Sequence, residues 1–130
     1  MSVIDRIKAK LGEYPGIRYS EAPNEIEVHP TDDSGFAVGL RVSDHAYTVW
    51  FDGWHEDFAS EDEALDCFVF GLSPGCRLAV VLRGDTTTKW IVESLRDGQW
   101  TQDSVTGLLL QPFWRKACVI YRQNRLIAAG

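Results

Sequence analysis

Short stretches of the chain alternate between apolar residues and polar or small ones. In residues 36–42 every second side chain is apolar, which is the period of a strand with one buried face. Such alternation, together with apolar runs between turn residues, predicts six strands, over residues 25–29, 36–42, 47–52, 77–83, 89–95 and 113–122. The dipeptide Asp97-Gly98 favours a type I′ hairpin, so the fifth strand turns back there. Residues 101–112 are less patterned and predict a loop with a short strand or turn.

Two stretches have the helical period instead. Residues 2–10 place apolar side chains three or four positions apart, with Ser2 as N-cap and Gly12 as the stop. A second helix begins after Ser60, because Ser60-Glu61-Asp62-Glu63 is a capping box, and it is broken near residues 72–75. Its second half is apolar on nearly all sides, which indicates a helix pressed against a sheet.

The resulting order is α-βββ-α-βββ. Strands in consecutive runs, joined by tight turns, predict one antiparallel sheet of about six strands with the helices packed on one face. No linker, repeat or low-complexity tract divides the chain, so we expect residues 1–130 to form a single α+β domain. The size, the acidity and the α-βββ-α-ββ opening resemble those of small acidic bacterial chaperones dedicated to secreted clients. That resemblance covers topology and charge, and it implies a dimer.

Charge is unevenly distributed along the chain, whose formal net charge is −6. Residues 1–76 hold fifteen acidic and five basic residues, a net charge of −10, whereas residues 77–130 hold four acidic and eight basic residues, a net charge of +4. The acidic half disfavours nonspecific binding to nucleic acids and anionic membranes, and favours a basic partner or a second copy docked head to tail. A solvated acidic surface that aids solubility explains the same pattern more simply.

The cysteines and the apolar runs bear on location. Three cysteines without a C-x-x-C pair predict neither a disulfide framework nor a zinc site. No apolar run approaches the about 20 residues that span a bilayer, so we expect a cytoplasmic protein. Cys67 and Cys118 fall within apolar runs and are predicted to be core residues. Cys76 is the one thiol that we expect to be worth testing with a thiol reagent.

The first candidate site is the segment 50–57, Trp50-Phe51-Asp52-Gly53-Trp54-His55-Glu56-Asp57, expected between a strand and the capped helix. His55 could exchange a proton near neutral pH, tuned by Asp52 or Glu56, and Trp50 and Trp54 could contact a ligand. A solvated histidine beside strand-core aromatics explains the segment more simply. No ligand spacing matches a known metal pattern, so we expect neither a metal nor a cofactor.

The second candidate site joins aromatic and basic residues of the second half. Its members are Trp90, Trp100, Trp114, Arg115, Lys116, Arg122 and Arg125. On the last predicted strand, Trp114 and Lys116 share one face and Arg115 shares the other with Phe113. Aromatic rings beside cations can bind partners or anionic ligands. The same residues also suit a sheet with one wetted face, over which long basic stems cover apolar surface.

The usual catalytic and nucleotide-binding motifs are absent. The sequence has no phosphate-binding P-loop, no G-x-G-x-x-G turn, no H-E-x-x-H and no G-x-S-x-G. We therefore expect a non-catalytic interaction domain that binds a protein partner or a second copy of itself, and no nucleic acid. Two alternatives stay open. One is a small-ligand binder with a pocket lined by Trp and Phe, and the other is a small hydrolase or isomerase centred on His55 with Asp52 or Glu56.

Overall fold

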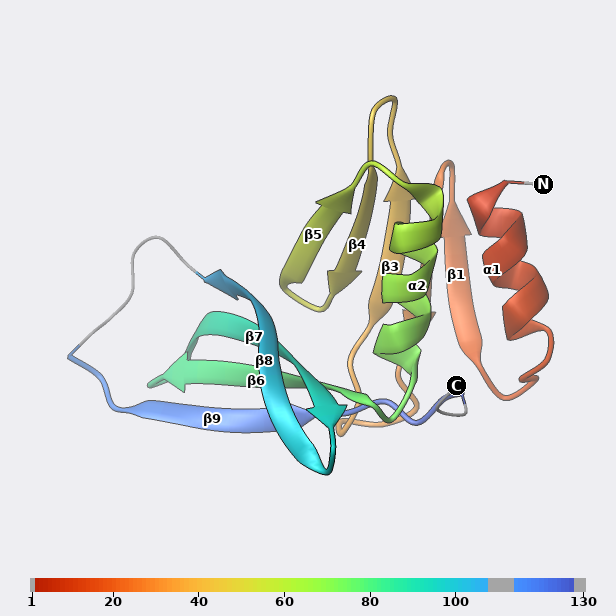
Figure 1. Cartoon of the computed structure of the whole chain (residues 1–130). Coiled ribbons are helices and arrows are strands. Elements are labelled where there is room, and N and C mark those ends of the chain that lie inside the picture. The colour runs from red at the N-terminus through yellow and green to blue at the C-terminus, as the bar shows by residue number, and fades with distance from the viewer. Residues whose placement is uncertain (1, 108–113, 128–130) are drawn as a thin grey trace.

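The computed structural model describes residues 2–107 and 114–127 and has two helices and nine strands there (Figure 1). The prediction of an α+β protein with antiparallel pairing is confirmed. The prediction of one sheet with about six strands is wrong, because the strands form two sheets, of five and four strands.

The first sheet is a meander in which each strand pairs with the next along the chain. Its strands are β1 (Arg18–Ala22), β2 (Glu25–His29), β3 (Val38–Val42), β4 (Tyr47–Phe51) and β5 (Trp54–Phe58). The order across the sheet is β1-β2-β3-β4-β5, and all pairs are antiparallel.

The two helices belong to this first sheet. Helix α1 (Val3–Leu11) begins at the predicted cap, where Ser2 and Asp5 bond each other's backbone N–H, and ends at Gly12. Helix α2 (Glu61–Leu72) begins with the Ser60 hydroxyl accepting a hydrogen bond from the Glu63 amide. Figure 1 shows α2 over the middle of the five-stranded sheet and α1 next to β1.

The core of the described residues lies mainly between these helices and the first sheet. Its largest fully buried side chains include Phe36, Phe51, Phe68, Ile7, Ile26, Leu40 and Leu72. Gly71 makes the packing of α2 possible, because a Cβ there would lie 2.4 Å from the ring of Phe51. Helix and sheet therefore meet at closer range than any side chain at position 71 would allow.

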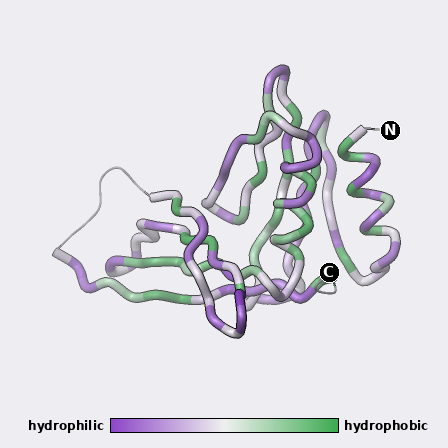
Figure 2. Tube along the Cα trace, viewed as in Figure 1, coloured by the Kyte–Doolittle hydropathy of each residue, from purple (hydrophilic) through white to green (hydrophobic). Residues whose placement is uncertain are grey.

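The second sheet follows α2 and consists of β6 (Cys76–Arg83), β7 (Thr86–Arg96), β8 (Gln99–Gly107) and β9 (Ala117–Arg122). Its order is β8-β7-β6-β9, so β9 joins the edge opposite to β8. Asp97 and Gly98 both have positive φ, 52° and 79°, which confirms the predicted hairpin turn. Neither described helix covers a face of this sheet, and Figure 2 shows hydrophobic residues along β6 and β9.

Three of the nine strands were not predicted. Residues 18–22 precede the first predicted strand, 54–58 overlap the first candidate site, and 99–107 lie largely in the unpatterned stretch. Their burial explains the error: β1 is exposed throughout, and β5 and β8 are exposed at most positions. Such strands need no apolar alternation. The last strand begins at Ala117 and not at Phe113, which lies outside the described residues.

Several contacts join the two sheets. The buried Asn124 side chain accepts a hydrogen bond from the Phe36 amide and donates to the carbonyl groups of Phe36 and Gly71. The Trp54 indole donates to the Ser104 hydroxyl at 3.1 Å. Gly53 lies under the ring of Trp90, where a Cβ would be 2.2 Å from the ring. The strand β9 is thus tied, through the residues just after it, to the core of the first sheet.

The two described helices have nine and twelve residues, and neither combines the length and apolar character of a membrane-spanning helix.

Candidate binding surfaces

The segment 50–57 forms a hairpin, not a loop. Strands β4 and β5 pair through it, with Trp50 opposite His55 and Phe51 opposite Trp54, and Asp52-Gly53 makes the turn. Because strand residues alternate between faces, His55 lies on the face of Trp50, and Glu56 lies on the helix-facing side with Trp54. The sheet therefore separates His55 from Glu56.

The surroundings of Asp52 and His55 also differ. Asp52 has a positive φ of 50° and accepts a hydrogen bond from the Ala37 amide at 2.9 Å. Partial burial raises the pKa of its carboxyl, against the opposing effect of the Ala37 N–H. His55 is exposed, and its backbone amide donates to Thr106. Within the described residues, no hydrogen bond or ion pair links the His55 ring to Asp52 or Glu56.

The outer face of the first sheet, opposite the helices, is polar and hydrogen-bonded across its strands. Trp50 covers Gly39, and its indole donates to Glu27 at 2.7 Å. Further pairs on this face are Arg41 with Glu25, Thr48 with Asp57 and Ser20 with His29. We call this surface the polar face. The polar groups named here bond one another across the strands, which suits a face in contact with water.

The corresponding face of the second sheet is mostly apolar. Alternation and register place these residues there: Arg77, Ala79, Val81, Lys89, Ile91, Glu93, Leu95, Trp100, Gln102, Val105, Ala117, Val119 and Tyr121. Arg77 is ion-paired with Glu93, and its guanidinium lies 4.5 Å from the Trp100 ring centroid and 4.0 Å from that of Tyr121. We call this surface the open face. Tryptophan, tyrosine and arginine together are typical of binding hot spots.

Among the described residues, strand β9 pairs with β6 alone and so forms a free edge of the second sheet. Every residue from Ala117 to Tyr121 is exposed, and the exposed fractions of Val119, Ile120 and Tyr121 are 46%, 43% and 53%. Val119 and Tyr121 belong to the open face, and Ile120 lies on the opposite one. Natural sheet edges are normally protected by charges, proline or a bulge. Residues 117–121 carry none of these.

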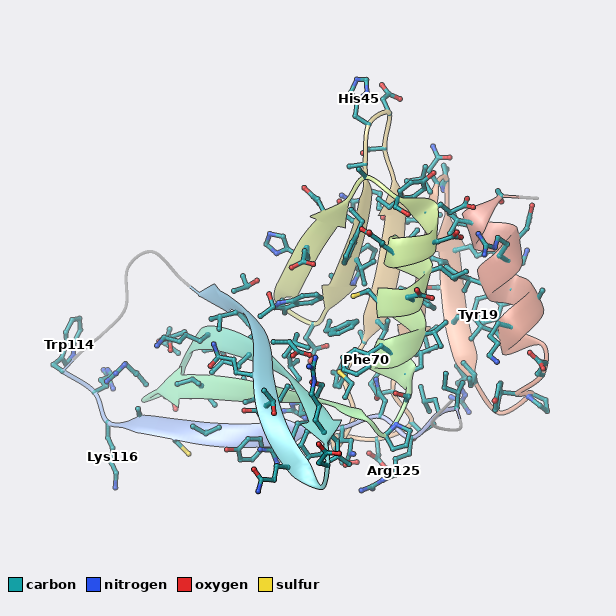
Figure 3. All side chains as sticks on the ribbon, in the orientation of Figure 1. Tyr19, His45, Phe70, Trp114, Lys116 and Arg125 are labelled. Atoms are coloured by element: carbon teal, nitrogen blue, oxygen red, sulfur yellow. The ribbon has the colours of Figure 1, made fainter. Side chains whose placement is uncertain are left out.

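The residues of the second candidate site do not form one patch. Trp90 packs over Gly53 on the side that faces the first sheet, whereas Trp100 lies on the open face. Trp114 is 82% exposed and precedes β9 together with Lys116 (Figure 3). The predicted division of Trp114 and Arg115 between two strand faces is wrong, because both precede the strand. Arg115 packs against Gly84.

A groove lies where β5, α2 and the second sheet meet. The sequence left open a pocket lined by Trp and Phe but did not predict this position. The groove's lining residues are Phe51, Trp54, Glu56, Phe58, Asp66, Cys67, Phe70, Val92, Asp103 and Ser104, around about 350 Å³. We call it the intersheet groove. Figure 3 shows Phe70 near the end of α2, on the side of the second sheet. The pattern Trp54, Glu56, Phe58 could have indicated a shared face, but only with β5 recognised as a strand.

The cysteines are placed differently from the prediction. Cys76 is buried and Cys118 is exposed, because Cys76 begins a central strand and Cys118 lies on the edge strand. Cys67 is partly buried. Burial, with a smaller contribution from Glu56, raises the pKa of the Cys67 thiol to about 12. Burial also raises the pKa of Cys76. The thiol suited to reagents is therefore Cys118.

No family model matches this chain, and neither curated proteins nor solved structures give a match. The resemblance to small acidic secretion chaperones depended on an α-βββ-α-ββ opening, whereas five strands lie between the two helices.

Proposed function

We propose that this protein is a non-catalytic interaction domain that binds an extended segment of another protein beside β9. One observation carries the proposal: the free edge of the second sheet has exposed apolar side chains on both of its faces. An added strand satisfies the outward backbone groups of such an edge, and its own side chains cover those of the edge strand.

The open face supplies the specific part of this interaction. A segment lying beside β9 would contact Val119 and Tyr121. Tyr121 in turn packs against the Arg77 guanidinium. Arg77 is already held by Glu93 and two aromatic rings. A side chain ordered before binding loses less entropy on binding, which favours affinity. The exposed Trp114 ring, just before β9, offers a further aromatic contact.

The basic residues at both ends of β9 indicate which kind of partner segment would fit beside it. Arg115 and Lys116 precede β9, and Arg122 and Arg125 lie at its other end and beyond. Two copies of β9 paired antiparallel would bring these basic ends together, which costs free energy. A partner segment with an apolar centre and acidic ends avoids that repulsion and gains attraction at both ends. We therefore favour such a segment over a second copy.

Binding of synthetic peptides tests the proposal. We use a short peptide in which valine and threonine alternate between acidic ends, and a twin in which lysines replace the acidic residues. The acidic peptide is expected to bind about tenfold more tightly at low salt, measured by fluorescence polarisation. Amide chemical shifts of β9 should change on its addition.

A matched pair of variants locates the site. Val119→Lys places a charge on the β9 edge, and Val105→Lys places the same charge on the same face but on β8, where Val105 is 44% exposed. Only Val119→Lys should abolish peptide binding. Equal binding of both peptides, or equal loss in both variants, contradicts the proposal. A dimer in gel filtration that Val119→Lys dissociates would assign the edge to a second copy instead.

A further inference from the structure

We propose that the intersheet groove binds an organic cation, an ammonium or guanidinium group on a short apolar stem. This site lies on the helix-facing side of β5 and shares no residue with β9, so it is independent of the interaction proposed above. Its volume of about 350 Å³ lies within the range of small-ligand pockets.

Aromatic rings form the floor and walls of the groove. Phe51 and Trp54 are almost fully buried, with their ring centroids 4.7 Å apart. Phe58 and Phe70 are partly buried. The one polar atom of the Trp54 ring is already bonded to Ser104, so this ring has no donor to spare for a ligand. It can offer only a small apolar surface, so the π systems that would meet a cation are chiefly those of the partly buried Phe58 and Phe70.

Acidic side chains supply the charge at the mouth of the groove. Glu56, Asp66 and Asp103 line it, and none of the described lining residues is basic. Asp103 is paired with Arg96 at 3.4 Å, whereas neither Glu56 nor Asp66 makes an ion pair within the described residues. Two carboxylates thus face an aromatic hollow without a counter-charge. The thiol of Cys67 is neutral near neutral pH, because burial raises its pKa.

Other ligand classes fit less well. No group of three or more His, Cys, Asp or Glu among the described residues is arranged to hold a metal ion, and the volume of about 350 Å³ suits an organic ligand. An anionic ligand would be repelled. A neutral apolar ligand would leave the carboxylates less hydrated without a compensating partner, which is unfavourable.

The same cation chemistry has two sources, a free amine or a Lys or Arg side chain of a peptide. The experiment therefore compares n-butylammonium and n-butylguanidinium with short alanine peptides that carry one central Lys or Arg. Neutral n-butanol is the matched control. A free amine as the natural ligand predicts that butylammonium binds as tightly as the peptides. A side-chain ligand predicts peptides at least about tenfold tighter, because they add backbone contacts.

The readout is the indole N–H signal of Trp54 in two-dimensional NMR spectra, which detects millimolar binding. Trp50, on the polar face of the same sheet, provides an internal reference. We expect the cations to shift the Trp54 signal in a saturable way, without moving that of Trp50. A shift of equal size with n-butanol would overturn the proposal, and so would the absence of a saturable shift with every cation tested.

Charge-neutral variants complete the test. Glu56→Gln and Asp66→Asn keep the shape of the groove and should each weaken cation binding about three- to tenfold. The controls are Asp57→Asn, on the opposite face of β5, and Glu63→Gln, one turn before Asp66 on α2; both should bind as the parent does. Since all four positions are exposed, each variant is expected to fold. Unchanged affinity in both groove variants would overturn the assignment of the carboxylates.

Discussion

The two sheets of this protein each leave one face uncovered, and the two faces are built differently. On the polar face of the first sheet, charged and polar groups of neighbouring strands bond one another, and Trp50 is held by Glu27. On the open face of the second sheet, valine, isoleucine, leucine and aromatic side chains surround a single arginine stack. Both faces contain a tryptophan, so the aromatic content alone does not distinguish them.

The contrast shows that the amount of apolar surface buried on one side of a sheet determines whether its other side can be polar. The first sheet obtains its hydrophobic stabilisation from the helices on its other side, so its outer face is free to be polar. The second sheet has no helix of its own among the described residues. Its inner face joins the core of the first sheet through Leu78, Val80 and Val92, and meets the β4–β5 hairpin at Trp90, Ser104 and Thr106. Its apolar outer face offers additional burial only if a partner covers it.

The largest expected effect concerns the core beneath α2. Phe68 is 1% exposed, and Phe68→Ala should lower the free energy of unfolding by about 3–5 kcal/mol, because it removes a ring and leaves a cavity. Tyr121→Ala on the open face should lower it by less than about 1 kcal/mol. Urea unfolding followed by circular dichroism measures both. Similar losses in the two variants would mean that the second sheet is as tightly packed as the first.

The reactivity of the cysteine thiols compares the solvent accessibility of β9 with that of helix α2 on the first sheet. At pH 8, Cys118 should react with a thiol reagent at least about a hundredfold faster than Cys67, whose raised pKa of about 12 leaves very little thiolate. Peptide mapping by mass spectrometry after timed labelling gives the two rates. Raising the pH towards 12 should narrow the difference. A Cys118 that reacts no faster than Cys67 would indicate that β9 is already covered in solution.

An intermediate effect is expected at the clamp between the sheets. Asn124→Ala leaves the buried amide of Phe36 and the carbonyl groups of Phe36 and Gly71 without this partner. The free energy of unfolding should fall by about 2 kcal/mol. Arg125→Ala, the next residue along the chain and exposed, is the control and should change it little. The rate of amide hydrogen exchange should then rise more in β9 than in β2. An equal rise in the two strands would mean that pairing with β6, and not Asn124, holds β9 in place.

The smallest effect is expected on the polar face. Glu27→Gln keeps an acceptor for the Trp50 indole but removes the charge, so the free energy of unfolding should change by less than about 1 kcal/mol. Peptide binding at β9 should not change at all. A measurable loss of peptide binding would show that the two outer faces are coupled.

The sequence predicted those elements whose ends carry a recognisable capping or turn motif. Both helix starts followed from Ser2 and Ser60, and the β7–β8 turn followed from Asp97-Gly98. The same dipeptide recurs at Asp52-Gly53, where it makes the turn between β4 and β5. Period two, applied through this turn, would have placed His55 and Glu56 on opposite faces.

The division into two sheets and the intersheet groove could not be predicted from these patterns. Both depend on pairings between residues far apart in sequence, such as β6 with β9, and on close contacts such as Gly53 under Trp90. A glycine whose lack of a side chain makes room for a ring from a distant strand cannot be told, in the sequence, from an ordinary turn glycine. The burial of Cys76 and the exposure of Cys118 were likewise set by strand order and not by local composition.

The Asn124 clamp also has a mechanical consequence. A segment bound beside β9 and pulled along its length would load the β6–β9 hydrogen bonds in shear, the direction in which many bonds resist together. Beyond Arg122 the load would pass through Asn124 to Phe36 and Gly71, and so into the tightly packed body under α2. The exposed edge is therefore anchored in the buried core beneath α2, and tension on a bound partner would pass beyond the second sheet into that core.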